Sequence, residues 1–469
     1  MSYIGPKGYS IKKKLISVEE QRIIRKELDV APFVPKSSPV RPKSFAVYRE
    51  STNKLYVPRF YGITKYGEPK SIKISDGMPI QVLFAGTLRP KQKIVVNKYL
   101  KHIKNKNCGL LELYCGFGKT VCALNIITKL QKKTLVIVHK TFLMNQWEEK
   151  IREFIPNAKI GKIQGETIDV EDKDIVLGML QSISMKDYPI SLFQQFGLTI
   201  IDETHHIGAE VFSQALFKIV TKNMLGLSAT MKRKDGLTKI FKLFLGDIVY
   251  SEKRESGKNV LVRAYFYEHS DEDFSKVHLN FRGHTHYALM IKKLCEFSYR
   301  TEFILKILKD VLRDDKDRQI MILAHNKNIL KYLYDAIEHR KIESVGYYIG
   351  GMKKKDLNIS STKKIIIATY AMAEEGLDIK TLNTLIMATP KTDVVQSIGR
   401  ILRCSHDQPL IIDIVDQHQV FKNQWNKRLR YYKKQKYTIL KCDGQNYNYS
   451  EQLIKKPKKK HPLLTGICY

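Results

Sequence analysis

Short apolar runs rich in β-branched residues recur from about residue 81 onward, and stretches with helical periodicity separate them. The first set is TLVIVH (134–139), DIVLGM (174–179), LTIID (198–202) and MLGLSAT (224–230). Strand-forming runs that alternate with helices predict a parallel sheet wrapped by helices. We therefore expect at least one α/β unit in this part of the chain.

The same alternation resumes after a polar break at 251–259, SEKRESGKN. The second set of runs lies at 260–267, 319–325, 344–350, 364–369, 384–389 and 409–415. Two α/β units of similar size are therefore predicted in tandem, over residues 81–255 and 256–420.

Regions of a different character flank the two predicted units. Residues 1–80 are predicted to form an accessory region that begins with a helix over 17–29, capped by Ser17. A linker with four prolines follows at 30–42, and 45–62 are predicted to form a hairpin around a turn at Ser51–Asn53. Residues 421–469 are predicted to be a basic tail, in which a Tyr-rich helical stretch precedes a turn-rich end.

Positive charge dominates the composition. The 469 residues include 81 Lys and Arg against 47 Asp and Glu, which gives a formal net charge of +34. Residues 1–80 contribute +9 of this charge and residues 422–460 contribute +11. Such flanks favour a polyanionic partner, most commonly nucleic acid. Solubility combined with a Lys-rich coding bias is the alternative explanation.

Several classes of protein are excluded by the sequence. It contains no run of 18 apolar residues that would predict a membrane span, and its N-terminus has no apolar segment typical of a secretory signal. The seven cysteines form no CxxC pair, which argues against a zinc or iron–sulfur site and favours a reducing compartment.

Residues 113–120, LYCGFGKT, match the GK[ST] end of a phosphate-binding loop. The backbone N–H groups of Gly116, Phe117 and Gly118 would hold phosphates at the start of the helix that follows. Lys119 would reach the β- and γ-phosphates, and Thr120 would bind Mg²⁺. Leu113 replaces the first glycine of the strict GxxxxGK[ST] pattern, so a glycine-rich turn without a nucleotide is the alternative.

A pair of carboxylates follows the predicted strand at 198–202. Asp202 is placed to contact Mg²⁺, and Glu203 could orient and deprotonate the water that attacks the phosphate. A lysine-bearing phosphate loop and a strand that ends in Asp-Glu, about 80 residues apart in one α/β unit, together predict an ATPase or GTPase.

The residues DETH, 202–205, resemble the DExH box of superfamily 2 helicases and translocases. Further motifs of this family are matched in the expected order along about 340 residues. They are LRPKQ (88–92), VHKTFLMNQW (138–147), LQS (180–182), LSAT (227–230), AHNK (324–327), IATYAMAEEGLDIKTLNTLIMATP (367–390) and QSIGRILR (396–403). The resemblance implies two tandem RecA-like domains that use ATP and Mg²⁺.

The resemblance also implies roles for individual residues. Gln92 would contact the adenine, and Asp378 would bond the ribose, with Gly376 permitting its close approach. Arg400 and Arg403, three apart on an expected helix, would stabilise the charge that develops on the transferred phosphoryl group. Coupling of hydrolysis to movement is assigned to His205, Ser228, Ala229, Thr230 and Gln396. Contacts to nucleic acid are assigned to His139, Lys140, Thr141, Gln181, Ser182, Asn326 and Thr369.

Within the superfamily, LSATMKRKDGLTKIFKLFLGDIVY and QSIGRILR resemble the XPB-like group, which includes transcript-release helicases of poxviruses and related large DNA viruses. This implies ATP-driven translocation on duplex DNA or its unwinding, in viral transcription or in repair and recombination, with RNA polymerase or other transcription factors as partners. Location in the host cytoplasm or the virion would follow for a viral protein, and in the nucleus otherwise. An RNA helicase is the first alternative, and a non-catalytic ATP-binding scaffold is the second. The flanks contain no convincing nuclease motif.

Aromatic residues are interleaved with the cations of the predicted tail. Trp425, Tyr431, Tyr432 and Tyr437 would stack on bases or sugars beside phosphate contacts. The alternative for Trp425, Tyr431 and Tyr432 is that they pack a C-terminal helix against the second α/β unit. The run KKPKKKH (455–461) is expected to contact phosphates, or else to act as a nuclear-import signal or a solvated end.

Overall fold

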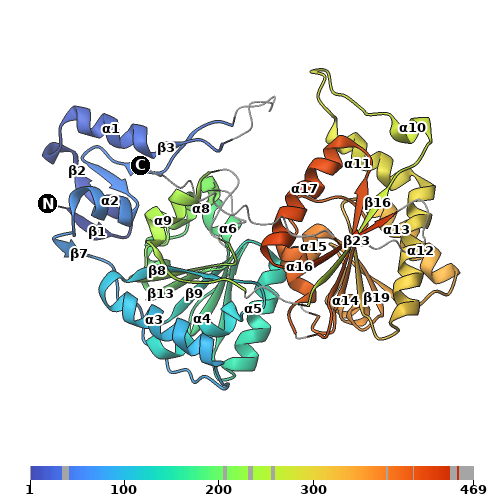
Figure 1. Cartoon of the computed structure of the whole chain (residues 1–469). Coiled ribbons are helices and arrows are strands. Elements are labelled where there is room, and N and C mark those ends of the chain that lie inside the picture. The colour runs from blue at the N-terminus through green and yellow to red at the C-terminus, as the bar shows by residue number, and fades with distance from the viewer. Residues whose placement is uncertain are drawn as a thin grey trace, which may run out of the picture. The chain divides into compact units, whose positions relative to one another are not determined.

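The computed structural model describes residues 2–33, 42–203, 209–230, 236–254, 259–376, 379–404, 406–443 and 452–453. It divides the chain into two compact units, Met1–Lys253 and Arg254–Tyr469 (Figure 1). No helix among the described residues is long and apolar enough to cross a membrane.

Unit 1 is built on an eight-stranded sheet with the order β11-β10-β12-β9-β13-β14-β8-β15. Its strands are β8 (Cys108–Leu113), β9 (Thr134–Val138), β10 (Ile160–Gln164), β11 (Thr167–Asp169), β12 (Ile175–Met179), β13 (Leu198–Ile201), β14 (Asn223–Ser228) and β15 (Ile248–Glu252). All neighbours pair in parallel except β10 and β11. The predicted parallel sheet is confirmed, and each of the four runs of the first set forms a strand.

Helices cover both faces of this sheet because successive side chains of a strand point to opposite sides. In β8, Leu110 joins one hydrophobic cluster and Leu111 joins the other. The helices of unit 1 that follow the accessory region are α3 (Pro90–Lys106), α4 (Lys119–Leu130), α5 (Thr141–Phe154), α6 (Leu180–Met185), α7 (Ile190–Gln194), α8 (Ala209–Leu216) and α9 (Thr238–Leu245). Residues of α3, α4 and α5 pack in one cluster, and residues of α8 and α9 pack in the other.

The accessory region has a five-stranded sheet of its own, with the order β5-β6-β2-β1-β7. Its elements are β1 (Tyr3–Gly5), β2 (Gly8–Lys12), a short 3-10 helix (Lys13–Leu15), α1 (Val18–Leu28), β3 (Asp29–Val30), β4 (Phe45–Ala46), β5 (Arg49–Glu50), β6 (Lys54–Val57), α2 (Arg59–Tyr66) and β7 (Ser71–Ile72). The predicted cap is confirmed, because the Ser17 side chain accepts a hydrogen bond from the Glu20 N–H. Most of the Pro-rich linker lies outside the described residues.

The predicted hairpin over 45–62 is wrong in its second half. β5 and β6 do pair around the turn at Ser51–Asn53, but a helix, α2, begins at Arg59. Pro58 precedes the helix, and Gly67 ends it with a φ of 78°. Close packing on Tyr9 favours this helix. Gly62 of α2 lies so near Tyr9 that a Cβ added to it would be 2.2 Å from the ring.

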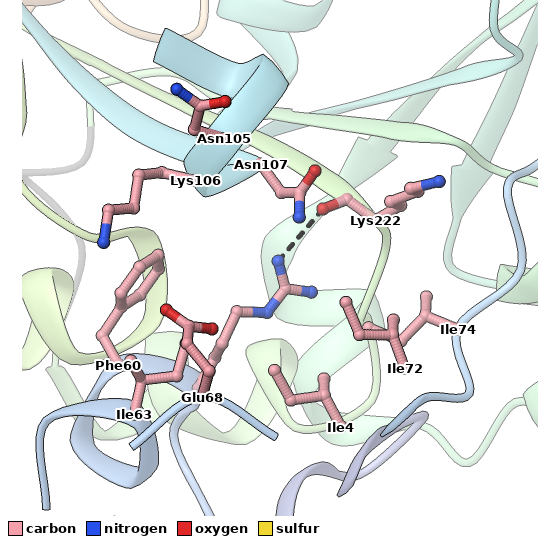
Figure 2. Close-up of a pocket in the computed structure, with 11 residues that line it drawn as sticks. Ile4, Phe60, Ile63, Glu68, Ile72, Ile74, Asn105, Lys106, Asn107 and Lys222 are labelled. Carbon is pink, nitrogen blue, oxygen red and sulfur yellow. Dashed lines mark hydrogen bonds between the residues drawn. The ribbon is translucent and has the colours of Figure 1, made fainter. Parts of the chain in front are cut away.

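Arg59 of α2 fixes the accessory region to the sheet of unit 1. Its buried guanidinium donates hydrogen bonds to the carbonyl oxygens of Thr221 (2.7 Å) and Lys222 (3.0 Å) and to Cys108 Sγ (2.7 Å). A pocket of about 40 Å³ lies beside these contacts (Figure 2). Figure 2 shows side chains from both sides of this junction around the pocket, among them Ile4 and Asn107.

Unit 2 contains a second eight-stranded sheet, with the order β18-β19-β17-β20-β21-β16-β22-β23. Its strands are β16 (Leu261–Tyr267), β17 (Ile320–Ala324), β18 (Val345–Tyr348), β19 (Ile365–Thr369), β20 (Thr384–Met387), β21 (Leu410–Asp416), β22 (Thr438–Asp443) and β23 (Gln452–Leu453). Its helices are α10 (Glu272–Ser275), α11 (Tyr287–Glu296), α12 (Ser298–Asp314), α13 (Lys327–His339), α14 (Lys354–Ser361), α15 (Tyr370–Gly376), α16 (Val395–Ile401) and α17 (Gln419–Lys434). The pairs from β18 through β22 are parallel, so the second predicted α/β unit is also confirmed.

Residues 421–443 do not form a separate tail, contrary to the sequence prediction. β22 pairs in parallel with β16 over six residues, and α17 packs against the same sheet. Arg428 of α17 forms two hydrogen bonds of 2.8 Å with the buried carboxylate of Asp413, which also accepts one from Tyr432 Oη. A buried ion pair on the face of α17 that packs on the sheet therefore holds the helix to the middle of β21, which the charge of the helix alone does not reveal.

Candidate active site

Three predicted motifs meet at one edge of the unit 1 sheet. Strands β13, β14 and β8 are parallel neighbours in that order, so their carboxyl ends lie side by side. β8 leads into the loop 114–118, β13 leads into Asp202 and Glu203, and β14 ends at Ser228. Open α/β sheets bind ligands at this edge, outside the carboxyl ends of their strands.

The phosphate loop has the backbone that its glycines predict. Gly116 and Gly118 adopt φ values of 88° and 93°, in a region that side-chain-bearing residues rarely occupy. Gly118 is the residue that precedes α4, so the positive end of a twelve-residue helix faces the loop. The loop therefore fits a phosphate group, with Lys119 and Thr120 on the first turn of the helix.

Gln92 supports this loop from α3. Its amide Nε2 donates to the carbonyl oxygen of Phe117 (2.9 Å), and its Oε1 accepts from the Arg89 N–H (2.9 Å). A Cβ added to Gly118 would lie 2.4 Å from Gln92 Nε2, so the loop and the amide are fitted to each other. Gln92 was predicted to contact adenine, and its amide is held here by the phosphate loop.

Arg89 is a contact that the sequence prediction missed. Its guanidinium donates to the carbonyl oxygens of Phe117 and, at 3.4 Å, of Gly116. Arg89 belongs to the motif LRPKQ, in which the family resemblance implies a role for the glutamine alone.

Lys119 and Glu203 form an ion pair, with 2.7 Å between Nζ and Oε1. Burial lowers the pKa of Lys119, but the charge of Glu203 and its neighbours outweighs this and raises it overall, so the amine stays charged. Glu203 has a φ of 48°, an uncommon and strained value for a residue with a side chain. Strain at a carboxylate that also holds the loop lysine is typical of a functional site.

Asp202 is buried and accepts two hydrogen bonds. Trp147 Nε1 donates to Oδ2 (2.8 Å), and the Glu203 N–H donates to Oδ1 (2.9 Å). Burial, reinforced by the charge of Glu203, raises the pKa of Asp202 to about 6. A desolvated carboxylate beside a second carboxylate fits a divalent cation, which would stabilise its ionised form.

Trp147 is the second contact that the sequence prediction missed. It lies on α5, and 55 residues separate it from Asp202 in the chain. The signal that could have found it is that a buried indole N–H normally requires an acceptor.

Ser228, Ala229 and Thr230 lie between the phosphate loop and Asp202 along the sheet edge. Ser228 Oγ donates to the Thr230 carbonyl oxygen (2.6 Å) and accepts from the Thr230 N–H (3.2 Å). These two hydrogen bonds close a tight turn over residues 228–230, between the phosphate loop and Asp202. His205, its predicted coupling partner, lies outside the described residues.

The predicted nucleic-acid contacts of unit 1 form a second group on the same sheet edge. His139, Lys140 and Thr141 follow β9, while Gln181 and Ser182 follow its parallel neighbour β12. Gln181 Nε2 donates to the His139 carbonyl oxygen (3.1 Å), which ties the two segments together. The structure therefore brings these five residues together.

Unit 2 holds the remaining predicted residues. Gln396 and the buried Arg400 lie on α16, which ends at Ile401. Arg403 lies beyond this end, so the expectation that both arginines share one helical face is wrong. The helix ends earlier than its sequence period suggested, because Leu402 has left helical geometry with φ −114° and ψ 15°.

Further unit 2 candidates lie after parallel strands of its sheet. Asn326 precedes α13 after β17, and Thr369 ends β19. These strands are neighbours, so the two residues share a sheet edge. Gly376 is the last residue of α15, whereas Asp378 lies outside the described residues.

Two family models match the chain. Residues 85–233 match the model described as type III restriction enzyme, res subunit. Residues 303–405 match the helicase conserved C-terminal domain. The two matches fall in unit 1 and unit 2, respectively.

Proteins from large DNA viruses are similar in sequence to this chain over nearly its whole length. A protein of Acanthamoeba polyphaga mimivirus, named ATP-dependent RNA helicase L396, is 37% identical over 465 residues, which cover 96% of this chain and 87% of the relative. An African swine fever virus protein, named ATP-dependent RNA helicase QP509L, is 25% identical over 491 residues, with 96% and 94% covered.

The fold is also similar to a solved structure. Dbp5 of S. cerevisiae aligns with a TM-score of 0.52 and 14% identity, covering 75% of this chain and 90% of Dbp5. This supports the two RecA-like domains that the sequence resemblance implied. The family models and the viral relatives identify the chain as a superfamily 2 helicase, a nucleic-acid-dependent ATPase.

Proposed function

We propose that this helicase uses ATP and Mg²⁺ to translocate on duplex DNA or to unwind it. The observation that carries the ATPase assignment is the cluster of Lys119, Asp202 and Glu203 beside the phosphate loop. DNA is favoured as substrate because the family model that matches residues 85–233 is described as a type III restriction enzyme, res subunit. Restriction enzymes act on duplex DNA.

Bound ATP supplies the phosphoanhydride bond that hydrolysis breaks. The N–H groups at the start of α4 would hold phosphate oxygens, and Thr120 and Asp202 would hold a magnesium ion, which would offset the negative charge of the phosphates. Lys119 turns from Glu203 toward a phosphate, because a phosphate offers it more negative charge than one carboxylate does. Glu203, released from the lysine, orients the attacking water and accepts its proton.

This exchange gives the Lys119–Glu203 pair a role in control. While the pair is intact, the positive charge of the lysine lowers the basicity of the carboxylate. The general base is therefore weak until a nucleotide draws the lysine away. Arg400 and Arg403 are proposed to stabilise the charge of the transition state, as the sequence resemblance implied.

RNA is the second candidate substrate. The observation that favours it is that the mimivirus and African swine fever virus relatives are both named RNA helicases. Contacts to phosphates and sugars do not distinguish the two polymers by themselves. A role in viral transcription, with RNA polymerase or other transcription factors as partners and a location in the host cytoplasm or virion, is also part of the proposal.

The test is an ATPase assay of the purified chain with duplex DNA, single-stranded DNA and RNA as separate activators. We expect duplex DNA to raise kcat most, and Glu203→Gln to abolish the stimulation while leaving nucleic-acid binding intact. Stimulation of the ATPase by RNA alone would mean that RNA, and not DNA, is the substrate. No stimulation by any of the three would refute the proposed function.

A further inference from the structure

The five-stranded sheet of the accessory region has one apolar face and one face of a different kind. Ile4, Tyr9 and Leu55 point from its strands into the hydrophobic core of unit 1. Their neighbours in sequence point to the opposite side, because side chains alternate along a strand. The cross-strand pairs Tyr3–Ser71, Tyr3–Ser10 and Ser10–Tyr56 form a continuous row on that outer face.

At least one lysine ammonium group lies near the ring of each tyrosine in this row. Lys7 Nζ lies 5.4 Å from the centre of the Tyr56 ring, while Lys54 and Lys73 lie 5.3 Å and 5.1 Å from that of Tyr3. Both rings are partly exposed. The outer face therefore combines accessible aromatic rings with ammonium groups held close to them.

The positive charge of this face is not balanced within the described structure. Lys12 pairs across the sheet with Lys54, so a fourth ammonium lies on the same face. None of these four lysines, Lys7, Lys12, Lys54 and Lys73, forms an ion pair with a described residue. Burial raises the pKa of the Tyr3 hydroxyl, but the hydrogen bond and charge of Lys54 and the charge of Lys73 lower it overall. Like charges that converge in this way favour an anionic partner.

One edge of this outer face, at β5, packs against the part of unit 1 that follows the accessory region. The guanidinium of Arg49, on the edge strand β5, lies over the ring of Phe217 and donates to the Gln214 carbonyl oxygen. The face thus has a fixed orientation on unit 1, and it ends at this arginine. The hydrogen bonds of Arg59 to Thr221 and Lys222 also hold the accessory region to the sheet of unit 1.

We propose that this outer face, defined by Tyr3, Tyr56, Lys7, Lys12, Lys54 and Lys73, binds single-stranded nucleic acid. Bases stack on the two rings, and the ammonium groups contact the phosphates between them, which is how sequence-tolerant single-strand sites are built. Tyr3 and Tyr56 are separated by two strand spacings, roughly 10 Å, so each ring accepts its own base. The proposal rests on the proposed function in that a helicase needs to hold a single strand.

The experiment measures binding of fluorescein-labelled oligo-dT and oligo-U to the full chain, without nucleotide, over a series of salt concentrations. One variant carries Lys7→Glu, Lys54→Glu and Lys73→Glu, and a second carries Tyr3→Leu and Tyr56→Leu. The lysine variant should lower the slope of log affinity against log salt by about 2, since each lost single-strand phosphate contact removes about 0.7. The tyrosine variant should weaken binding by about fivefold or more through lost stacking.

The matched control carries Lys26→Glu, Lys101→Glu and Lys129→Glu, an equal change of charge at exposed positions outside this face. It should retain the wild-type salt slope. An equal loss in the control would make the effect one of net charge and overturn the proposal, as would wild-type binding by both test variants. An acidic protein as the true partner would give that second result.

ATPase measurements separate this proposal from the proposed function. At saturating duplex DNA, both test variants should keep the wild-type kcat, because none of the altered residues belongs to the ATP site. A wild-type chain that no nucleic acid stimulates refutes the helicase function. A stimulated wild-type chain whose single-strand affinity is insensitive to all five substitutions refutes the binding face alone.

Discussion

Lys119 Nζ lies 2.7 Å from Glu203 Oε1, so the lysine of the phosphate loop is bonded to the carboxylate proposed as the general base. Both side chains are largely buried, with 11% and 19% of their surfaces exposed. The two residues that are proposed to act separately in ATP hydrolysis are thus each other's partner in this structure. The sequence placed both residues in the site but did not reveal that they contact each other.

Lys119→Ala should abolish ATP turnover and also destabilise the fold. A lysine that only reached outward would change the free energy of unfolding by about ±0.5 kcal/mol. Its loss here leaves the carboxylates of Asp202 and Glu203 adjacent without their cation, so we expect a cost of about 1–2 kcal/mol. Urea unfolding measures this cost. The double variant Lys119→Ala/Glu203→Gln should recover part of it, and a double variant no more stable than Lys119→Ala would contradict the pairing.

Glu203→Gln should bind ATP but hydrolyse it slowly. The amide keeps the size of the side chain and loses the proton acceptor, which typically costs about 10²–10⁴-fold in rate. Single-turnover hydrolysis and equilibrium binding of a labelled nucleotide measure the two effects separately. Loss of nucleotide binding would mean that Glu203 supports the loop or the metal instead.

Asp202 should make the chain less stable as the pH rises. Its pKa is about 6 in the folded chain against an ordinary value of 3.8, so the folded state binds more protons between these values. The free energy of unfolding then falls as the pH rises through this window, by at most about 1.4 kcal/mol per pH unit from this group. Asp202→Asn should remove this contribution in melts from pH 4 to pH 7. Identical pH profiles of the wild-type and variant melting temperatures would exclude a raised pKa.

Arg403→Ala should lower kcat more than it lowers ATP affinity, because a charge that acts on the transition state contributes little to ground-state binding. Arg400→Ala should show a weaker kinetic effect together with a loss of stability, because Arg400 is buried on α16. Steady-state kinetics with a saturating activator distinguish the two. Unchanged kcat with weakened ATP affinity would rule out the proposed role of Arg403.

Deletion of residues 450–469 should weaken duplex DNA binding and flatten its salt dependence, by about 0.9 in slope for each lost phosphate contact. Basal ATPase should change little, since no proposed ATP contact lies there. A matched variant that neutralises the lysines of 455–460 keeps the chain length and tests charge alone. An unchanged salt slope in both would leave the import or solubility interpretation.

The sequence predicted the two sheets well because their central strands are apolar throughout. Runs such as TLVIV of β9 and IIIAT of β19 leave few alternatives to a buried parallel strand. β22, TILKCD, was missed because it carries polar residues near the sheet margin. The residues of α2 were taken for a strand because RFY is a strand-like aromatic run, and its packing on Tyr9 decides otherwise.

The candidate site was predictable as a set of residues and not as a network. Motif spacing identified Lys119, Asp202 and Glu203, since each follows a recognisable strand. The contacts Trp147–Asp202 and Arg89–Phe117 join segments 55 and 28 residues apart, and only the order of the strands in the sheet brings them together. The aromatic residues of α17 show the opposite error. Trp425 and Tyr432 are buried, which favours the packing alternative over base stacking for these two residues, and Tyr437, which follows the helix, is buried as well.

Because β22 pairs with β16, the sheet of unit 2 can be completed only late in translation. Chains emerge from the N-terminus, so β16 through β21 are available while residues 438–443 are still being made. During that interval β16 has an open edge, and Asp413 is without the guanidinium of Arg428. A chain that stops before residue 428 would therefore keep a strand edge and a buried carboxylate uncovered, and quality-control proteases would recognise it as incomplete.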